Sequence, residues 1–406
     1  MIPTNKVSSS NDQQHTSSKV LGKSLSSPGL NPGGFEHRHI TDAELKRHNT
    51  RESAWISVHN NVYDCTKFLK EHPGGSDSIL INAGTDCTEE FDAIHSTKAK
   101  AMLEDFKIGE MVSIGDSSIL TNGVNMPTVP KHVYPLSPIS ESRPIALNPT
   151  QKIKVKLASN ISLSHDVRLL RFELPSKEHI LGLPVGKHIF LSAMIDGKLC
   201  LRAYTPVSSN DDVGYFELLV KVYFKGVHPK FPDGGLMSQY LDSLKVGGSV
   251  EVKGPLGHIE YIGNGRYTQE GQHYYMKTCA MMAGGTGITP IYQLIRAILN
   301  DPSDTTEIYL VFANRTESDI MLRSELEIWT KEHPNFKLWY VVERAHDNGT
   351  WPYSLGFINE DILEEHLPEA SPVTSAFMCG PPPMIKFACL PNLEKMGYDK
   401  ARCHQF

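Results

Sequence analysis

Two histidines in the first third of the chain have the surroundings expected of metal ligands. His72 follows an apolar pair and precedes Pro-Gly-Gly at 73–75, and His95 closes the segment Phe-Asp-Ala-Ile at 91–94. A lone histidine is more often a surface or satisfied core residue than a ligand. Here, however, each histidine stands at an expected helix boundary, where Pro73 ends a helix and the glycines allow a tight turn beside a flat ligand. The apolar residues expected to line such a slot are Phe68, Leu69, Ile79, Ile81, Phe91, Ile94 and Leu103.

A second group of residues is suited to a phosphorylated aromatic cofactor. Arg202, Tyr204 and Thr205 bring together a guanidinium for a diphosphate, a ring that can pack on a flavin, and a hydroxyl. About 35 residues later, Gly-Gly-Leu-Met-Ser at 234–238 should begin a helix, whose free backbone N–H groups attract phosphate. Either motif alone could be a strand end or a helix cap.

A third group has the pattern of a dinucleotide site. Gly-Gly-Thr-Gly at 284–287 lies between an expected strand and helix, where glycines let the backbone approach a pyrophosphate. Cys379 ends a later strand, and a buried thiol is the alternative interpretation. Asp319 follows the second strand, where a carboxylate could accept a bond from a ribose 2′-hydroxyl and repel a 2′-phosphate. Arg315 would act in the opposite direction, and the alternative for both is a solvated loop.

The elements that must position these groups follow from hydrophobic periodicity. The capping box at residues 41–44 predicts the start of a short helix, and the pattern of residues 55–63 predicts a hairpin. Strands at 153–157, 167–172, 217–224 and 250–252 indicate a small antiparallel barrel. Strands at 277–283, 308–313, 338–343 and 376–379, with a helix at 290–300, indicate a parallel α/β domain.

Composition narrows the class of protein. The chain has 406 residues, 40% hydrophobic and 21% charged, with a net charge of −6. This excludes collagen, a coiled coil and a wholly disordered chain, and no global basic field favours nucleic acid. No apolar stretch is long enough to span a membrane, and no signal peptide is evident, so a cytoplasmic protein is expected. Seven widely spaced cysteines without CxxC argue against a disulfide framework or a cysteine-based metal site.

These patterns predict five segments. We expect a disordered tail at 1–35, a domain that carries the two histidines at 36–110, a Pro-rich linker at 111–150, an antiparallel domain at 151–270 and a parallel α/β domain at 271–406. The family resemblances that follow imply that these three domains bind haem, FAD and NAD, respectively.

Residues 37–110 resemble cytochrome b5, on the His-Pro-Gly-Gly motif and the histidine 23 positions later. The resemblance implies that His72 and His95 are the axial ligands of haem b, which leaves no open coordination position and restricts the module to electron transfer. Acidic residues around it, Glu71, Asp77, Glu89, Glu90 and Asp92, could dock a basic partner.

The remainder resembles the cytochrome b5 reductase branch of the ferredoxin-reductase superfamily. The resemblance implies that Cys379 orients hydride transfer, and it places Lys221 among both the catalytic and the flavin-binding residues. The implied FAD residues are Arg202, Ala203, Tyr204, Thr205, Leu219, Val220, Lys221, Val222, Tyr223, Phe224, Phe231, Leu236, Met237, Ser238 and Thr289. The implied NADH residues are Gly284, Gly285, Thr286, Gly287, Asp319, Gly380, Pro381 and Met384.

Longer segments, such as KVYFKGVHPKFPDGGLMSQYLDSL and CGPPPMIKFACLPNLEKMGYD, resemble eukaryotic assimilatory nitrate reductase over residues 37–400. In that family a molybdenum domain and a dimerisation domain precede the haem module, and neither fits within 35 residues. We therefore expect the chain to be a monomer that corresponds to the haem and FAD half of such an enzyme, which supplies the electrons. A basic–x–x–Ser–x–Pro pattern at Ser26 resembles the family's 14-3-3 site, with plain linker as the alternative.

The expected function is electron transfer from NADH through FAD and haem to an external one-electron acceptor, such as cytochrome c or a separate molybdenum domain. Nitrate reduction by the chain alone is not expected. One alternative is a cytochrome b5 reductase fusion that supplies lipid-modifying or metal-reducing acceptors. Another is a non-catalytic haem-binding module, which would predict eroded reductase motifs.

Overall fold

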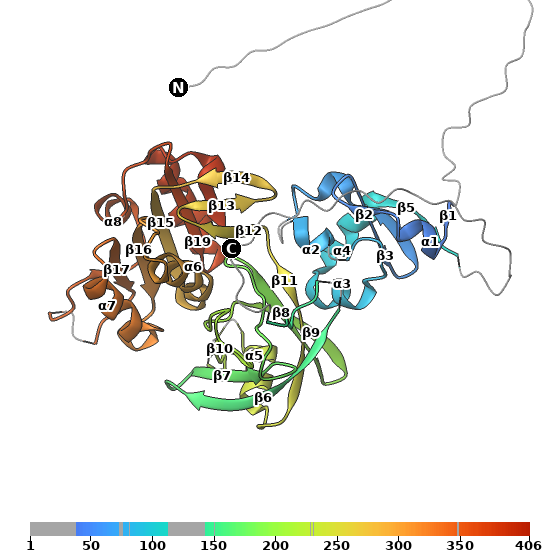
Figure 1. The fold of residues 1–406 in the computed structure, drawn as a ribbon, viewed down its shortest axis with the longest axis horizontal. Helices are drawn as coiled ribbons and strands as arrows, with labels where there is room; N and C mark the ends of the chain where they lie inside the picture. The colour runs from blue at the N-terminus through green and yellow to red at the C-terminus, as the bar shows by residue number, and fades with distance from the viewer. Residues whose placement is uncertain are drawn as a thin grey trace, which may run out of the picture. The chain divides into compact units, whose positions relative to one another are not determined.

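The computed structural model describes residues 38–72, 76–80, 82–112, 143–149, 151–227, 229, 231–346 and 349–406 (Figure 1). The expected tail at 1–35, Ser26 and the Pro-Gly-Gly turn lie outside these residues, as does most of the expected linker. No helix among the described residues has both the length and the apolar character needed to cross a membrane.

The first domain surrounds a small five-stranded sheet with the order β1-β5-β4-β3-β2. Thr41 caps α1 by accepting a hydrogen bond from the Glu44 backbone N–H, as the capping box predicts. The expected hairpin is formed by β3 and β4, which are antiparallel. The strands are β1 (His39–Ile40), β2 (Asn49–Thr50), β3 (Ser53–Val58), β4 (Asn61–Asp64) and β5 (Lys107–Met111). The helices are α1 (Asp42–Leu45), α2 (Ser76–Leu80), α3 (Thr88–Ile94) and α4 (Thr97–Leu103), with 3-10 turns at Thr66–Phe68 and Glu104–Phe106.

The second domain is a six-stranded antiparallel sheet with the order β10-β7-β6-β11-β8-β9. Alternate residues such as Leu170, Phe172, Phe216 and Leu218 fill its interior, as the period of two predicts. Its strands are β6 (Ile153–Ser162), β7 (Val167–Glu173), β8 (His188–Ile195), β9 (Lys198–Tyr204), β10 (Tyr215–Lys221) and β11 (Ser249–Leu256), and its helix is α5 (Leu236–Ser243). Three further strands, β12 (Ile259–Gly263), β13 (Arg266–Gln269) and β14 (Gln272–Tyr275), form a separate antiparallel sheet.

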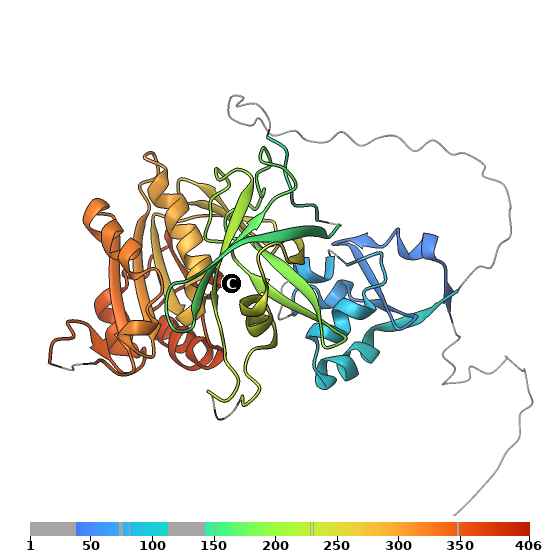
Figure 2. The same ribbon diagram turned by 90° about the horizontal axis from the view of Figure 1, so that it is seen from below.

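The third domain is a parallel sheet with the order β18-β17-β16-β15-β19-β20 and helices on both faces (Figure 2). Residues of α6 and α7 share one core with Leu310 and Phe312, whereas residues of α8 and α10 share another with Val311. The strands are β15 (Thr278–Gly284), β16 (Glu307–Asn314), β17 (Phe336–Val342), β18 (Ser354–Leu355), β19 (Thr374–Cys379) and β20 (Cys403–Gln405). The helices are α6 (Ile288–Asn300), α7 (Arg323–Glu332), α8 (Glu360–His366), α9 (Pro382–Met384) and α10 (Leu390–Lys395). Short helical turns lie at Gly285–Gly287, Glu317–Asp319, Ile385–Cys389 and Lys400–Arg402.

The sequence-based fold class is confirmed, and two boundaries differ from expectation. Arg202 and Tyr204 lie within the end of β9 rather than after a strand. Strand β10 ends at Lys221 rather than at 224, because the chain turns there toward α5, with the Tyr223 backbone N–H donating to Ser238 Oγ at 3.1 Å. All seven cysteines are free, and five of them are buried.

Candidate functional sites

The two histidines singled out in the sequence face each other in the first domain. His72 follows the turn at 69–71, and His95 is the C-cap of α3. Their ring centroids lie 6.0 Å apart with an interplanar angle of 45°. Because a bond between a metal and an imidazole nitrogen is about 2 Å long, one metal atom fits between rings at this separation.

Each ring is oriented through its Nδ1 atom. His95 Nδ1 lies 3.0 Å from the Phe91 carbonyl oxygen, and His72 Nδ1 lies 3.1 Å from Ser78 Oγ. A carbonyl only accepts, so Nδ1 of His95 carries the proton and Nε2 has the lone pair that a metal could bind. Burial lowers the pKa of His95, which favours the neutral imidazole that binds metals.

Aromatic and aliphatic side chains surround this pair. Phe68 contacts His72 with ring centroids 5.7 Å apart, and Phe91 stacks on His95 at 4.1 Å. Leu69, Ile79 and Leu103 are buried in the same core cluster. Of the predicted lining, Ile94 is exposed and Ile81 lies outside the described residues. A flat apolar cofactor held by two imidazoles fits these residues.

A cleft of about 1100 Å³ gathers the remaining predicted groups. The flavin motif reaches it from the end of β9, the Gly-rich turn from the end of β15, and the cysteine motif from the end of β19. The N-terminus of α6 faces the same space, as expected of a site for phosphate. The predicted residues that line the cleft are Arg202, Ala203, Tyr204, Thr205, Leu219, Val220, Lys221, Tyr223, Leu236, Met237, Ser238, Gly284, Gly285, Thr286, Gly287, Thr289, Asp319, Cys379, Gly380, Pro381 and Met384.

Three predicted flavin residues are not part of this lining. Val222 is buried, because its backbone N–H bonds to the Asp166 carbonyl oxygen and holds the residue against the barrel. Phe224 and Phe231 lie in the segment between β10 and α5, and Phe231 is exposed. The strand alternation of β10 does not continue beyond Lys221, so residues after that point cannot be assigned to a face by a period of two.

The Gly-rich turn and the cysteine motif are in direct contact. A Cβ atom on Gly287 would lie 2.2 Å from the Cys379 carbonyl oxygen, and one on Gly380 would lie 3.1 Å from the Gly284 Cα atom. Only glycine lets these two backbone segments approach so closely. Burial raises the pKa of Cys379 to about 11, so its thiol is neutral near pH 7. A neutral thiol supports a steric and orienting role rather than that of a nucleophile.

The flavin and nucleotide sides of the cleft are joined by specific hydrogen bonds. Arg296 of α6 donates from Nη1 to the Val207 carbonyl oxygen at 2.7 Å, directly after the flavin motif. The Gly186 backbone N–H donates to Gln293 Oε1, also at 2.7 Å. These bonds hold the helix that begins at the Gly-rich turn against the barrel.

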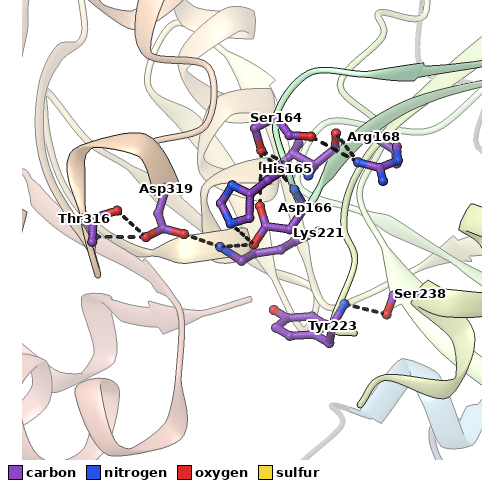
Figure 3. Close-up of polar contacts among 10 residues, drawn as sticks. Ser164, His165, Asp166, Arg168, Lys221, Tyr223, Ser238, Thr316 and Asp319 are labelled. Carbon is purple, nitrogen blue, oxygen red and sulfur yellow. Dashed lines mark hydrogen bonds and ion pairs between the residues drawn. The ribbon is translucent and has the colours of Figure 1, made fainter. Parts of the chain in front are cut away.

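Asp319 is held by partners on both of its carboxylate oxygens (Figure 3). Lys221 Nζ donates to Oδ1 at 2.6 Å, and the Thr316 backbone N–H and hydroxyl donate to Oδ2. Although burial opposes the shift, the hydrogen bond from Lys221 holds the pKa of Asp319 below its usual value. The predicted ribose acceptor therefore also belongs to an ion pair with a predicted catalytic lysine.

Several cleft residues were not identified from the sequence. Phe357 and Phe387 are about 70% exposed and line the cleft. His188 also lines it, and burial lowers its pKa to about 4. The signal that could have found Phe357 and Phe387 is a large apolar residue beside a Gly- or Pro-containing loop, and that signal is weak.

Phe406, which follows the polar residues 402–405, lines the cleft as well. Strand β20 pairs with β19, and His404 on it is 1% exposed. His404 Nε2 and Ser375 Oγ each lie 2.8 Å from Tyr267 Oη. The Phe406 backbone N–H bonds to the Met378 carbonyl oxygen at 3.1 Å. His404, Tyr267 and Ser375 thus form a buried hydrogen-bonded network, whereas Gln405 beside them is exposed.

Comparison with known families divides the chain into the same three parts. Residues 41–112 match the cytochrome b5-like heme/steroid binding domain. Residues 154–261 match the oxidoreductase FAD-binding domain, and residues 281–390 match the oxidoreductase NAD-binding domain.

Similar proteins extend the match along the chain. It is 59% identical over 397 residues to "Nitrate reductase [NADH] 2" of Phaseolus vulgaris, covering 96% of this chain and 44% of that protein. A Lotus japonicus NADH nitrate reductase is 58% identical, with 95% of this chain and 44% of that protein covered. The chain thus spans less than half the length of these curated relatives. The crystal structure of the cytochrome b5 reductase domain of Ulva prolifera nitrate reductase is 48% identical with a TM-score of 0.63, covering 64% of this chain and 100% of that domain.

Proposed function

The chain belongs to the nitrate reductase family, as a cytochrome b5-like domain joined to a cytochrome b5 reductase, and from this premise we propose its site residues, acceptors and location. It is an NADH-dependent oxidoreductase that supplies electrons from NADH through FAD to haem. FAD accepts two electrons as hydride and releases them singly, and a bis-histidine haem carries one electron at a time. The single observation that carries the proposal of sites is that one cleft is lined by both the flavin motif and the two nicotinamide motifs.

We assign roles within this cleft from the contacts of its residues. Arg202 and the N-terminus of α6 are oriented to bind phosphate groups, and Tyr204 offers an aromatic surface to a flat ring. Cys379 fixes the position of the nicotinamide, since its carbonyl packs on Gly287 and its thiol stays neutral. Asp319 accepts a hydrogen bond from the adenosine ribose and disfavours a 2′-phosphate.

His72 and His95 are the proposed axial ligands in the first domain. Their hydrogen bonds to Ser78 and to the Phe91 carbonyl fix the ring orientations, so the ligand geometry does not depend on the cofactor alone. If both imidazoles bind one haem iron, they would leave no position on it for oxygen or substrate, so the haem would supply one-electron transfer alone.

The proposed acceptors are one-electron acceptors, either a molybdenum domain of the kind found in nitrate reductases or, in an assay, cytochrome c. Acidic side chains near the proposed haem ligands, such as Glu71 and Glu89, suit a basic partner, whereas Asp92 is partly neutralised by Lys100 and also contacts His59. The cytoplasm is the proposed location, since the seven cysteines are free thiols. The 14-3-3 site at Ser26 stays a prediction.

Steady-state assays with two acceptors test this function. NADH should support reduction of both ferricyanide and cytochrome c, and raising the ionic strength should slow the cytochrome c reaction more, because it depends on docking of opposite charges. Failure of NADH to support either reaction in protein that contains FAD and haem would refute the proposal.

A further inference from the structure

Lys221 lies between two carboxylates that come from different parts of the reductase (Figure 3). Its Nζ atom is 3.0 Å from Asp166 Oδ2 and 2.6 Å from Asp319 Oδ1. Lys221 pairs with Val167 at the end of β10, so the antiparallel register brings Asp166, the residue before Val167, next to the ammonium. Asp319 reaches the same ammonium from the turn after β16.

The position of the ammonium explains why this group is not a metal site. Ligand atoms of His165, Asp166 and Asp319 lie within 4.8 Å of one another, a spacing that could suit a cation. Lys221 itself supplies the positive charge at that position. Although burial opposes the shift, the hydrogen bonds with Asp319 and Asp166 raise the pKa of Lys221, so the lysine stays charged.

The charges of the three side chains do not cancel. Their side chains are 13–17% exposed, so solvent screens them only in part. Two carboxylates and one ammonium give this cluster a net negative charge, and Arg315, which lines the same cleft, acts in the opposite direction. Lys221 and Asp319 line the cleft, whereas Asp166 does not, so Asp166 acts on a bound nucleotide by its charge and its bond to Lys221 rather than by contact.

We propose that Asp166 is a positioning residue that makes the reductase selective for NADH over NADPH. By sharing the ammonium of Lys221, it prevents Lys221 from neutralising Asp319, and the negative charge that disfavours a 2′-phosphate is retained. Without Asp166, the 2′-phosphate of NADPH would lie beside a Lys221–Asp319 pair that has no net charge. The ammonium of Lys221 could then turn toward the phosphate. This inference rests on the proposed function, in which Asp319 lies beside the adenosine ribose.

The test compares NADH and NADPH as donors to ferricyanide in the full chain containing FAD and haem. For Asp166→Asn, the ratio of kcat/KM for NADH to that for NADPH should fall about threefold to tenfold, as expected for one partly buried charge. The change should lie mainly in KM for NADPH. Asp166→Glu retains the charge and should keep the ratio close to that of the unmodified protein.

Asp242→Asn is the matched control. Asp242 is ion-paired with Arg168 at 2.7 Å in the same domain, its side chain is 24% exposed, and it does not line the cleft, so its substitution should leave the ratio unchanged. If Asp166→Asn does not fold, Lys221→Met provides the second test, because two unneutralised carboxylates should penalise NADPH more than NADH.

Asp319→Ala separates the two levels of the proposal. If Asp319→Ala lowers the ratio of kcat/KM for NADH to that for NADPH, while Asp166→Asn and Lys221→Met leave this ratio unchanged, the inference about Asp166 is wrong and the proposed ribose site stands. If Asp319→Ala also leaves the preference unchanged, the proposed position of the ribose is wrong.

Discussion

The haem-binding domain presents its two ligands on side chains of nearby segments, whereas the nucleotide cleft combines side chains with closely packed backbone from several strands. Each histidine ring is fixed by one local hydrogen bond, to Ser78 or to the Phe91 carbonyl. In the cleft, the ends of β9, β15 and β19, the N-terminus of α6 and two glycines that permit close approach create the binding surface. The two sites should therefore respond to different substitutions. Loss of one histidine side chain should abolish haem binding, whereas the nucleotide cleft should respond most to changes that displace its backbone.

The largest expected effect is the loss of one histidine. His72→Ala or His95→Ala should abolish stable haem binding or open a coordination position, since no second ligand can replace the imidazole. The visible spectrum checks this, and NADH:ferricyanide activity should persist because the cleft is unchanged. A low-spin spectrum like that of the unmodified protein in either variant would show that another residue is the ligand.

A backbone displacement should have the next largest effect, and on the other site. Gly287→Ala would place a Cβ atom 2.2 Å from the Cys379 carbonyl, so the two nicotinamide motifs must separate. A misplacement of about 1 Å can cost about a hundredfold in rate, and NADH:ferricyanide activity should fall on that scale. The haem spectrum should not change. The control is Gly271→Asn, because Gly271 has a positive φ and a Cβ atom there would have no neighbour within 4 Å, so this variant should retain activity. Normal activity in Gly287→Ala would contradict the close contact between Gly287 and the Cys379 carbonyl.

The smallest expected effect concerns the buried C-terminal network. Burial, with His258 and Arg402, lowers the pKa of His404 to about 3, so protonation of His404 is disfavoured in the folded state. Its contribution to stability is complete above the unfolded pKa of about 6.5 and is lost as the pH falls from there toward 3, by about 1.4 kcal/mol per pH unit.

Urea unfolding at pH 7 and at pH 5 measures this contribution. His404→Gln should lose less stability between the two pH values than the unmodified protein. His273→Gln, on the exposed strand β14, should match the unmodified protein. Equal pH dependence in His404→Gln and the unmodified protein would show that His404 does not remain neutral in the fold.

The parts that sequence predicted well are those set by local pattern. The histidine pair, the Gly-rich turn and the flavin motif each lie within a short segment, and strand and helix periods place most of the elements around them. Two features depend on contacts that no local pattern encodes. The partnership of Asp166 with Lys221 and Asp319 requires the register of β7 with β10 and the docking of the third domain. The burial of His404 requires β20 to join the edge of the parallel sheet beside β19.

Rapid anaerobic mixing of the oxidised protein with NADH, followed by its visible spectrum, tests most directly whether the chain transfers electrons from the cleft to the haem. Flavin absorbance should bleach first, and the reduced haem bands should follow without any added mediator. In His95→Ala the flavin should still bleach, and in Gly287→Ala both changes should slow together. Flavin reduction that leaves the haem oxidised in the unmodified protein, or haem reduction that is equally fast in Gly287→Ala, would contradict the account.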